Sequence, residues 1–329
     1  MSRRSFDAAA SLSILGALVC WSVVPLMLKA LTQAVPDGWT TNAVRYPVSA
    51  MLYLPWLIAA ARDPSARRLW TAAVIPSIPN VLGQSCWAWG PYFIDPGIMS
   101  FIVRLSVVWA MIMAMIVFRD ERPLLRSSRF WAGMLLSLAG FVTITTGKEH
   151  LFERQTLMGV GIALVCSFFW GMYGVSVRAT IGRSSPLQMF AIVSTYTSIG
   201  CLALAPLGDP SSILRLSAFN LSLLVVSALV GIAAAHGLYY TALQRLGATI
   251  PATVNVLTPF MTATASTFLF HERITAVQWV GGAVSVVGSI LVVLSQGHLR
   301  AAADGRTPTV GAADGGTAAP KPMRHQSLS

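Results

Sequence analysis

Apolar runs of about twenty residues recur along this chain of 329 residues, with short polar turns between them. An α-helix needs a run of this length to cross a hydrocarbon core about 30 Å thick. Only 11% of the residues are charged, against about 25% in soluble domains, so the chain lacks the charges to cover a soluble surface. Because lipid offers the backbone no hydrogen-bond partners, each run is expected to be helical. The sequence therefore predicts an all-α integral membrane protein.

We count ten transmembrane helices. Turns rich in Pro, Gly and Asp separate several of them, as at Asp95-Pro96-Gly97 and Gly208-Asp209-Pro210. The expected helices cover residues 11–31, 39–61, 69–91, 96–118, 128–146, 157–179, 187–207, 217–243, 248–270 and 275–296.

The pattern Trp-x-Gly-x3-Ser-x2-Gly begins at Trp131 and again at Trp279. Each copy follows a Glu-Arg pair, Glu121-Arg122 in the first case and Glu272-Arg273 in the second. Such an internal repeat divides the chain into two related halves. Small residues at this spacing let helices approach closely, so we assign the pattern to helix packing.

Ten helices in two halves give five helices each, and an odd number inverts the second half relative to the first. Inverted repeats are typical of transporters whose site lies at the repeat interface. The predicted organisation is a first repeat at 1–147, a second, inverted repeat at 156–296 and a disordered tail at 297–329. The tail is rich in Ala, Gly, Pro and Thr, which cannot build a packed core.

Basic residues alternate between the two faces of the expected membrane protein. With the N-terminus in the cytoplasm, sixteen Lys and Arg residues lie in cytoplasmic segments and five in external ones. The positive-inside rule then places both termini, and the tail, in the cytoplasm of a multi-pass inner-membrane protein. Because the basic residues fall in short loops rather than in one patch, nucleic acid is not an expected partner.

Two arginines fall inside expected helices, Arg45 in the second and Arg104 in the fourth. Ionisable residues at membrane depth are costly and usually face a cavity or a partner. Arg45 could instead extend to the interface and anchor its helix. All twelve Asp and Glu residues lie in loops, tails or helix ends, so no carboxylate neutralises these cations. Unpaired cations favour a substrate that carries a carboxylate or phosphate.

The repeat offset pairs Arg104 with Asn255, in equivalent helices at equal depth. Pro259 is expected to kink the second of these helices and free a carbonyl near its centre. Hydrogen bonding between helices is an alternative role for Asn255. His236 is the one histidine inside an expected helix, and its ordinary pKa near 6.5 makes it a candidate proton carrier. Packing is the alternative role for His236.

Aromatic residues are also candidates for the site. Trp21 and Trp170 occupy corresponding helices and could stack on a planar substrate or simply pack, and Tyr239 follows His236 closely. Much of the cluster Trp87, Trp89 and Tyr92 could belong to the aromatic belt at the interface, especially Trp89 and Tyr92. The predicted substrate-binding residues are Arg104, Asn255, Arg45, His236, Trp21, Trp170 and Tyr239.

The Arg45-Tyr46 pair, the two Glu-Arg turns and the repeated Trp-Gly-Ser-Gly pattern together resemble EamA-type transporters of the drug/metabolite transporter superfamily. The resemblance covers about residues 10 to 296. It implies a ten-helix inverted-repeat fold and alternating access around a central cavity. It also implies export or exchange of amino acids, other metabolites or drugs.

We therefore expect a secondary transporter for a small anionic or zwitterionic, amino-acid-like metabolite, acting as an exporter by alternating access. Alternatives are an uncoupled facilitator or channel, and an exporter of drug-like compounds. An enzyme is not expected, because no pair of catalytic groups lies at membrane depth. No metal or cofactor motif is present in the sequence. Expected partners are the substrate and the lipid bilayer, with protons as a candidate coupling ion and a homodimer as one candidate assembly.

Overall fold

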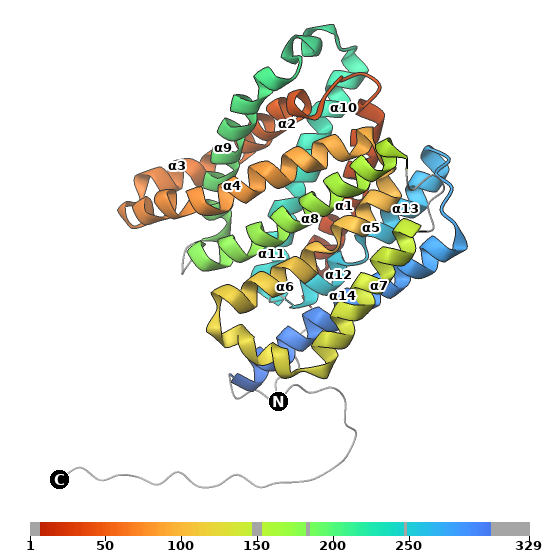
Figure 1. Ribbon diagram of the computed structural model, residues 1–329. Helices are drawn as coiled ribbons and strands as arrows, with labels where there is room; N and C mark the ends of the chain where they lie inside the picture. Colours follow the sequence, from red (N-terminus) through yellow and green to blue (C-terminus); the bar gives the residue numbers. More distant parts are fainter. Residues whose placement is uncertain (1–6, 147–152, 182–184, 247–248, 304–329) are drawn as a thin grey trace, which may run out of the picture.

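The computed structural model describes residues 7–146, 153–181, 185–246 and 249–303, and within these ranges the regular structure is entirely helical. Figure 1 shows the helices gathered into one bundle. The α-helices are α1 (Ala8–Leu31), α2 (Gly38–Leu52), α3 (Leu54–Arg62), α4 (Arg67–Trp89), α5 (Pro96–Val103), α6 (Ser106–Val117), α7 (Ser128–Thr146), α8 (Arg154–Ile181), α9 (Pro186–Leu204), α10 (Ala218–Ala228), α11 (Ala235–Leu246), α12 (Thr249–Asn255), α13 (Thr258–Leu269) and α14 (Ala276–Ala303).

Seven helical segments of the described chain are long and apolar enough to cross a membrane. The described parts of the other expected crossings, at 39–61, 69–91 and 249–270, are also largely helical. They contain polar residues such as Arg45, Asn80, Gln84 and Asn255. These residues supply polar groups to the interior of the bundle, as described below.

Three expected continuous helices are interrupted. The segment 96–118 is broken between α5 and α6 at Arg104 and Leu105, and 39–61 is broken at Tyr53. The segment 217–243 contains a six-residue π-helix, Leu229–Ala234, between α10 and α11. Only the break between α12 and α13 was expected, from Pro259. No proline marks the other interruptions near Arg104 or in the π-helix, so the sequence contained no comparable signal.

The two copies of the Trp-Gly-Ser-Gly pattern pack against each other, which confirms their assignment to helix packing. They lie on α7 and α14, which run side by side in Figure 1. A Cβ on Gly140 would lie 2.4 Å from the backbone nitrogen of Ser285, and one on Gly288 would lie 2.4 Å from that of Ser137. The Ser137 hydroxyl donates to the Ser285 carbonyl at 3.4 Å. The absent side chains let the two backbones touch.

The boundary expected for the C-terminal tail is wrong by several residues. Helix α14 continues to Ala303, beyond the expected start of the tail at residue 297. Alanine has the highest helix propensity, and Ala301–Ala303 extend the helix before any proline occurs. Residues 304–329 of the tail lie outside the described chain.

We expect Gly140→Ala to lower the thermal unfolding midpoint of the detergent-purified protein. The added methyl group would overlap the α14 backbone, and overpacking of this kind costs about 1–3 kcal/mol. The matched control is Gly161→Ala on α8, where a Cβ would meet nothing within 4 Å. That control should leave the midpoint unchanged or raise it, because alanine favours the helix. Equal midpoints for both variants would contradict the close packing of α7 on α14.

Candidate functional site

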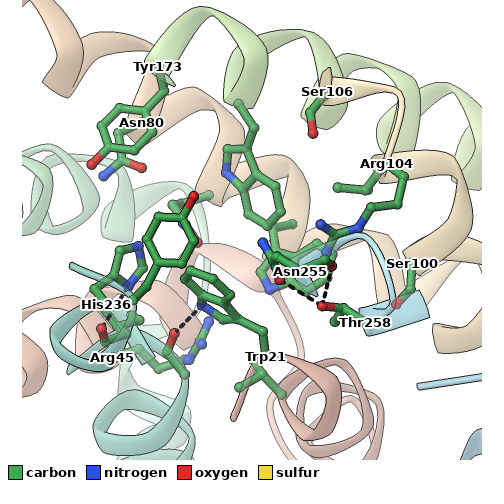
Figure 2. A pocket seen from close by; sticks show the side chains of 18 of the residues that line it. Trp21, Arg45, Asn80, Ser100, Arg104, Ser106, Tyr173, His236, Asn255 and Thr258 are labelled. Atoms are coloured by element: carbon green, nitrogen blue, oxygen red, sulfur yellow. Dashed lines mark hydrogen bonds between the residues drawn. The ribbon is translucent and has the colours of Figure 1, made fainter. Parts of the chain in front are cut away.

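A cavity of about 270 Å³ lies between the helices of both halves. Its wall includes residues from α1, α2, α4, α5, α6, α8, α11 and the segment around the α12–α13 break. Figure 2 shows polar and aromatic side chains gathered around it. The structure brings together all seven residues proposed from the sequence, namely Arg104, Asn255, Arg45, His236, Trp21, Trp170 and Tyr239.

Arg104 occupies the break between α5 and α6. Its backbone N–H donates to the Phe101 carbonyl at 3.1 Å, a short-range bond that closes the end of α5. The side-chain Nε is buried, and no hydrogen-bond partner for it is present in the described chain. A buried donor without a partner is costly. This N–H is therefore free to donate a hydrogen bond to an oxygen of a ligand. In Figure 2 it points toward Asn255 and Thr258.

Arg45 also lines the cavity, but its hydrogen-bonding groups are largely engaged by the protein. Its side chain is 1% exposed. Nε donates to the Ser227 hydroxyl at 3.0 Å, and one terminal nitrogen donates to the Asn42 side-chain oxygen at 3.4 Å. The alternative in which Arg45 extends to the interface does not hold, because these bonds keep it inside the bundle. It joins α2 to the last turn of α10 and adds positive charge to the wall.

Side chains contact three backbone carbonyls of the π-helix, and two of these belong to Gly231 and Ile232, which line the cavity. The Trp21 indole donates to the Gly231 carbonyl at 3.2 Å, and the Tyr53 hydroxyl donates to the Ala233 carbonyl at 2.6 Å. His236 Nδ1 lies 2.8 Å from the Ile232 carbonyl. Since a carbonyl only accepts, Nδ1 carries the proton, and Nε2 is the nitrogen that can gain or lose one. Short π-helical segments are frequent at functional sites.

At the break between α12 and α13, a threonine side chain binds the backbone carbonyl that has lost its helical partner. Pro259 has no N–H to donate to the Asn255 carbonyl four residues earlier. The Thr258 hydroxyl lies 2.7 Å from that carbonyl and 2.7 Å from the Asn255 side-chain oxygen. The predicted freed carbonyl therefore exists, but an adjacent side chain occupies it. These contacts fix Asn255 at the wall of the cavity, which Arg104 at the α5–α6 break also lines.

Aromatic rings form much of the remaining wall. Trp87 packs on Trp170 with 4.8 Å between ring centroids, and Trp21 packs on Tyr239 at 5.1 Å. His236 stacks on Phe190 at 4.4 Å. Trp87 is not part of an interfacial belt, because its side chain is buried at the cavity. Its position near the end of an apolar run did not reveal which way the side chain points.

Several residues of the wall were not identified from the sequence. Asn80 and Gln84 project from α4, and Asn80 donates to the Thr197 hydroxyl at 2.9 Å. Their spacing of four residues on an apolar helix was the available signal, because it places both amides on one face. The other residues missed are Ser100, Ser106, Tyr173, Tyr240 and Thr258.

The cavity has a positive electrostatic character. Arg45 and Arg104 are among the residues that line it, and none of the described lining residues is Asp or Glu. The remaining polar groups are amides, hydroxyls and one imidazole. Such a wall can neutralise an anion and hydrogen-bond to it, but it offers no carboxylate to an organic cation.

Comparison with known proteins agrees with this architecture. Two segments of the chain, residues 8–146 and 157–294, match the EamA-like transporter family. An uncharacterized inner membrane transporter of Escherichia coli, YhbE, is 24% identical over 79% of this chain and 79% of its own. An uncharacterized transporter of Haemophilus influenzae is 23% identical over 57% of this chain and 63% of its own.

A solved crystal structure of a protein is similar over 89% of this chain and 99% of its own, with a TM-score of 0.54 and 17% sequence identity. At that identity the similarity concerns the fold alone. The family matches cover both halves of the chain and include the residues of the cavity. The chain therefore belongs to the EamA-like transporter family.

Proposed function

We propose that this protein is a secondary transporter that exports a small anionic or zwitterionic, amino-acid-like metabolite across the inner membrane. The observation that carries the proposal is the Arg104 guanidinium, which lines a cavity without carboxylates and whose Nε lacks a partner in the described chain. A substrate carboxylate would supply the missing acceptor and charge. An inner-membrane location agrees with the name of the Escherichia coli relative.

The proposed architecture is ten crossings in two inverted repeats with both termini in the cytoplasm. Two family matches, one in each half, support the repeat. The helix breaks support it as well, because α5–α6 and α12–α13 are interrupted at nearly equivalent positions. Discontinuous helices at the repeat interface are a recurring way to build a substrate site in transporters.

Alternating access is supported by different contacts at the two ends of the bundle. At one end Arg178 of α8 pairs with Glu121 and with Asp120, the latter at 2.9 Å, and lies 4.0 Å from the Phe118 ring centroid. At the other end the Glu272 carboxylate meets the start of α5. Each contact joins one family segment to the other, so each end can separate or close when the halves rock.

Replacement of Arg104 tests the anion site. We expect Arg104→Ala to weaken binding of the transported anion about thirtyfold or more, because truncating a buried charge pair costs about 2–5 kcal/mol. Binding can be measured by thermal shift across amino acids, dicarboxylates and phosphorylated metabolites, with ethidium as a cationic drug. Arg62→Ala, at an exposed position, is the control. Stabilisation by ethidium alone would contradict the anion site and favour the exporter of drug-like compounds.

Imposed pH gradients in proteoliposomes distinguish coupled transport from a facilitator or channel. We expect uptake to respond to the gradient and His236→Gln to abolish the response. Glutamine can still donate to the Ile232 carbonyl, but it cannot titrate. A parent protein that transports at one rate under all gradients would establish the uncoupled alternative.

A further inference from the structure

The N-terminus of α5 is capped by a residue far away in the sequence. Asp95 occupies the N-cap position of α5, yet its side chain makes no capping hydrogen bond. Instead the backbone N–H groups of Gly97 and Ile98 donate to the two carboxylate oxygens of Glu272, each at 3.0 Å. Glu272 belongs to the second family segment and α5 to the first. The contact therefore joins the two halves.

The local structure is adapted to this contact. Glu272 is 6% exposed, and burial raises the pKa of its carboxyl, while the two N–H donors favour the ionised form. A Cβ on Gly97 would lie 2.7 and 3.0 Å from the carboxylate oxygens, so only glycine leaves room for them. His271 has a φ of 53°, a left-handed conformation that is rare for residues other than glycine. This turn after α13 immediately precedes Glu272.

Helix α5 connects this cap to the cavity. It has eight residues, all of them buried, and Arg104 is its C-cap. A helix of this length is about 12 Å long and has too few internal bonds to be stable alone. Its other end continues into α6 through a turn held by short-range bonds, such as the one from the Val107 N–H to the Arg104 carbonyl at 3.1 Å. The position of α5 therefore depends on that turn, on packing and on the groups that hold its N-terminus. Asp95 is engaged elsewhere, with a carboxylate oxygen 3.6 Å from the Lys29 ammonium.

We propose that Glu272 is a positioning residue that holds the Arg104 guanidinium at the cavity by capping the helix that ends at it. The Glu-Arg pair of the second half thus reaches the site through α5 without touching the cavity itself. Its counterpart Glu121 pairs with Arg178 at the opposite end of the bundle. The functional meaning of this inference rests on the proposed anion site at Arg104.

The test needs no substrate, so its outcome is separate from that of the anion-binding assay. Amide hydrogen exchange across residues 98–103 reports on α5, and phenylglyoxal labelling, read by mass spectrometry of arginine-containing peptides, reports on Arg104. We expect Glu272→Gln and Gly97→Ala each to raise α5 exchange and Arg104 labelling roughly fivefold to tenfold. A Cβ on Gly97 would also lie 3.0 Å from the Ala263 Cα, so Glu272→Gln, which adds no atom there, is the variant that isolates the cap.

Arg273→Gln is the matched control, because Arg273 is the exposed neighbour of Glu272, and it should behave as the parent. Arg45 is an internal control within each sample, since its labelling should stay unchanged in every variant. Faster α5 exchange with Arg104 labelling at the parent level would overturn the positioning role. Unchanged exchange, or equal increases at Arg45 and Arg104, would overturn it as well.

Discussion

The need to satisfy backbone hydrogen bonds in an apolar environment governs this structure. Unbroken helices satisfy that need by themselves, and the uninterrupted α4 supplies Asn80 and Gln84 to the cavity. Other helices near the cavity are interrupted, and specific side chains bind backbone groups at the interruptions. Thr258 serves the carbonyl freed by Pro259, while Trp21, Tyr53 and His236 serve the π-helix. Three of these four side chains, those of Thr258, Trp21 and His236, also line the cavity.

The repeated elements divide between scaffold and site. Where the two halves agree, at the Gly and Ser residues of α7 and α14, they pack on each other and hold the bundle together. Where they differ, at Arg104 and Asn255, they face one cavity. Identical small residues suit a close symmetric contact, because each backbone must approach the other. A substrate that is not itself symmetric requires different groups on the two sides.

Charge follows the same logic. Inside the bundle, the two arginines that line the cavity lie near amides, hydroxyls and rings. None of the described lining residues is a carboxylate that could neutralise their positive charge. At one end of the bundle, the Glu121 carboxylate pairs with Arg178. At the other end, the Glu272 carboxylate accepts hydrogen bonds from the α5 backbone. Equivalent glutamates thus perform different tasks, and the difference lies in the partner that the tertiary structure brings to each.

The sequence by itself determined the membrane class, the helical segments, the packing role of the repeated pattern and the position of Arg104 inside the bundle, because hydropathy and spacing can be read along the chain. It did not reveal the break at Arg104, the π-helix or the inward direction of Trp87, since no proline or periodic signal marks them. It predicted that Asp95 begins a turn, but only the tertiary structure decided that Glu272 caps α5. Carboxylates near and far in the sequence can each accept from the N–H groups at the start of a helix. Which of them does so depends on how the helices pack.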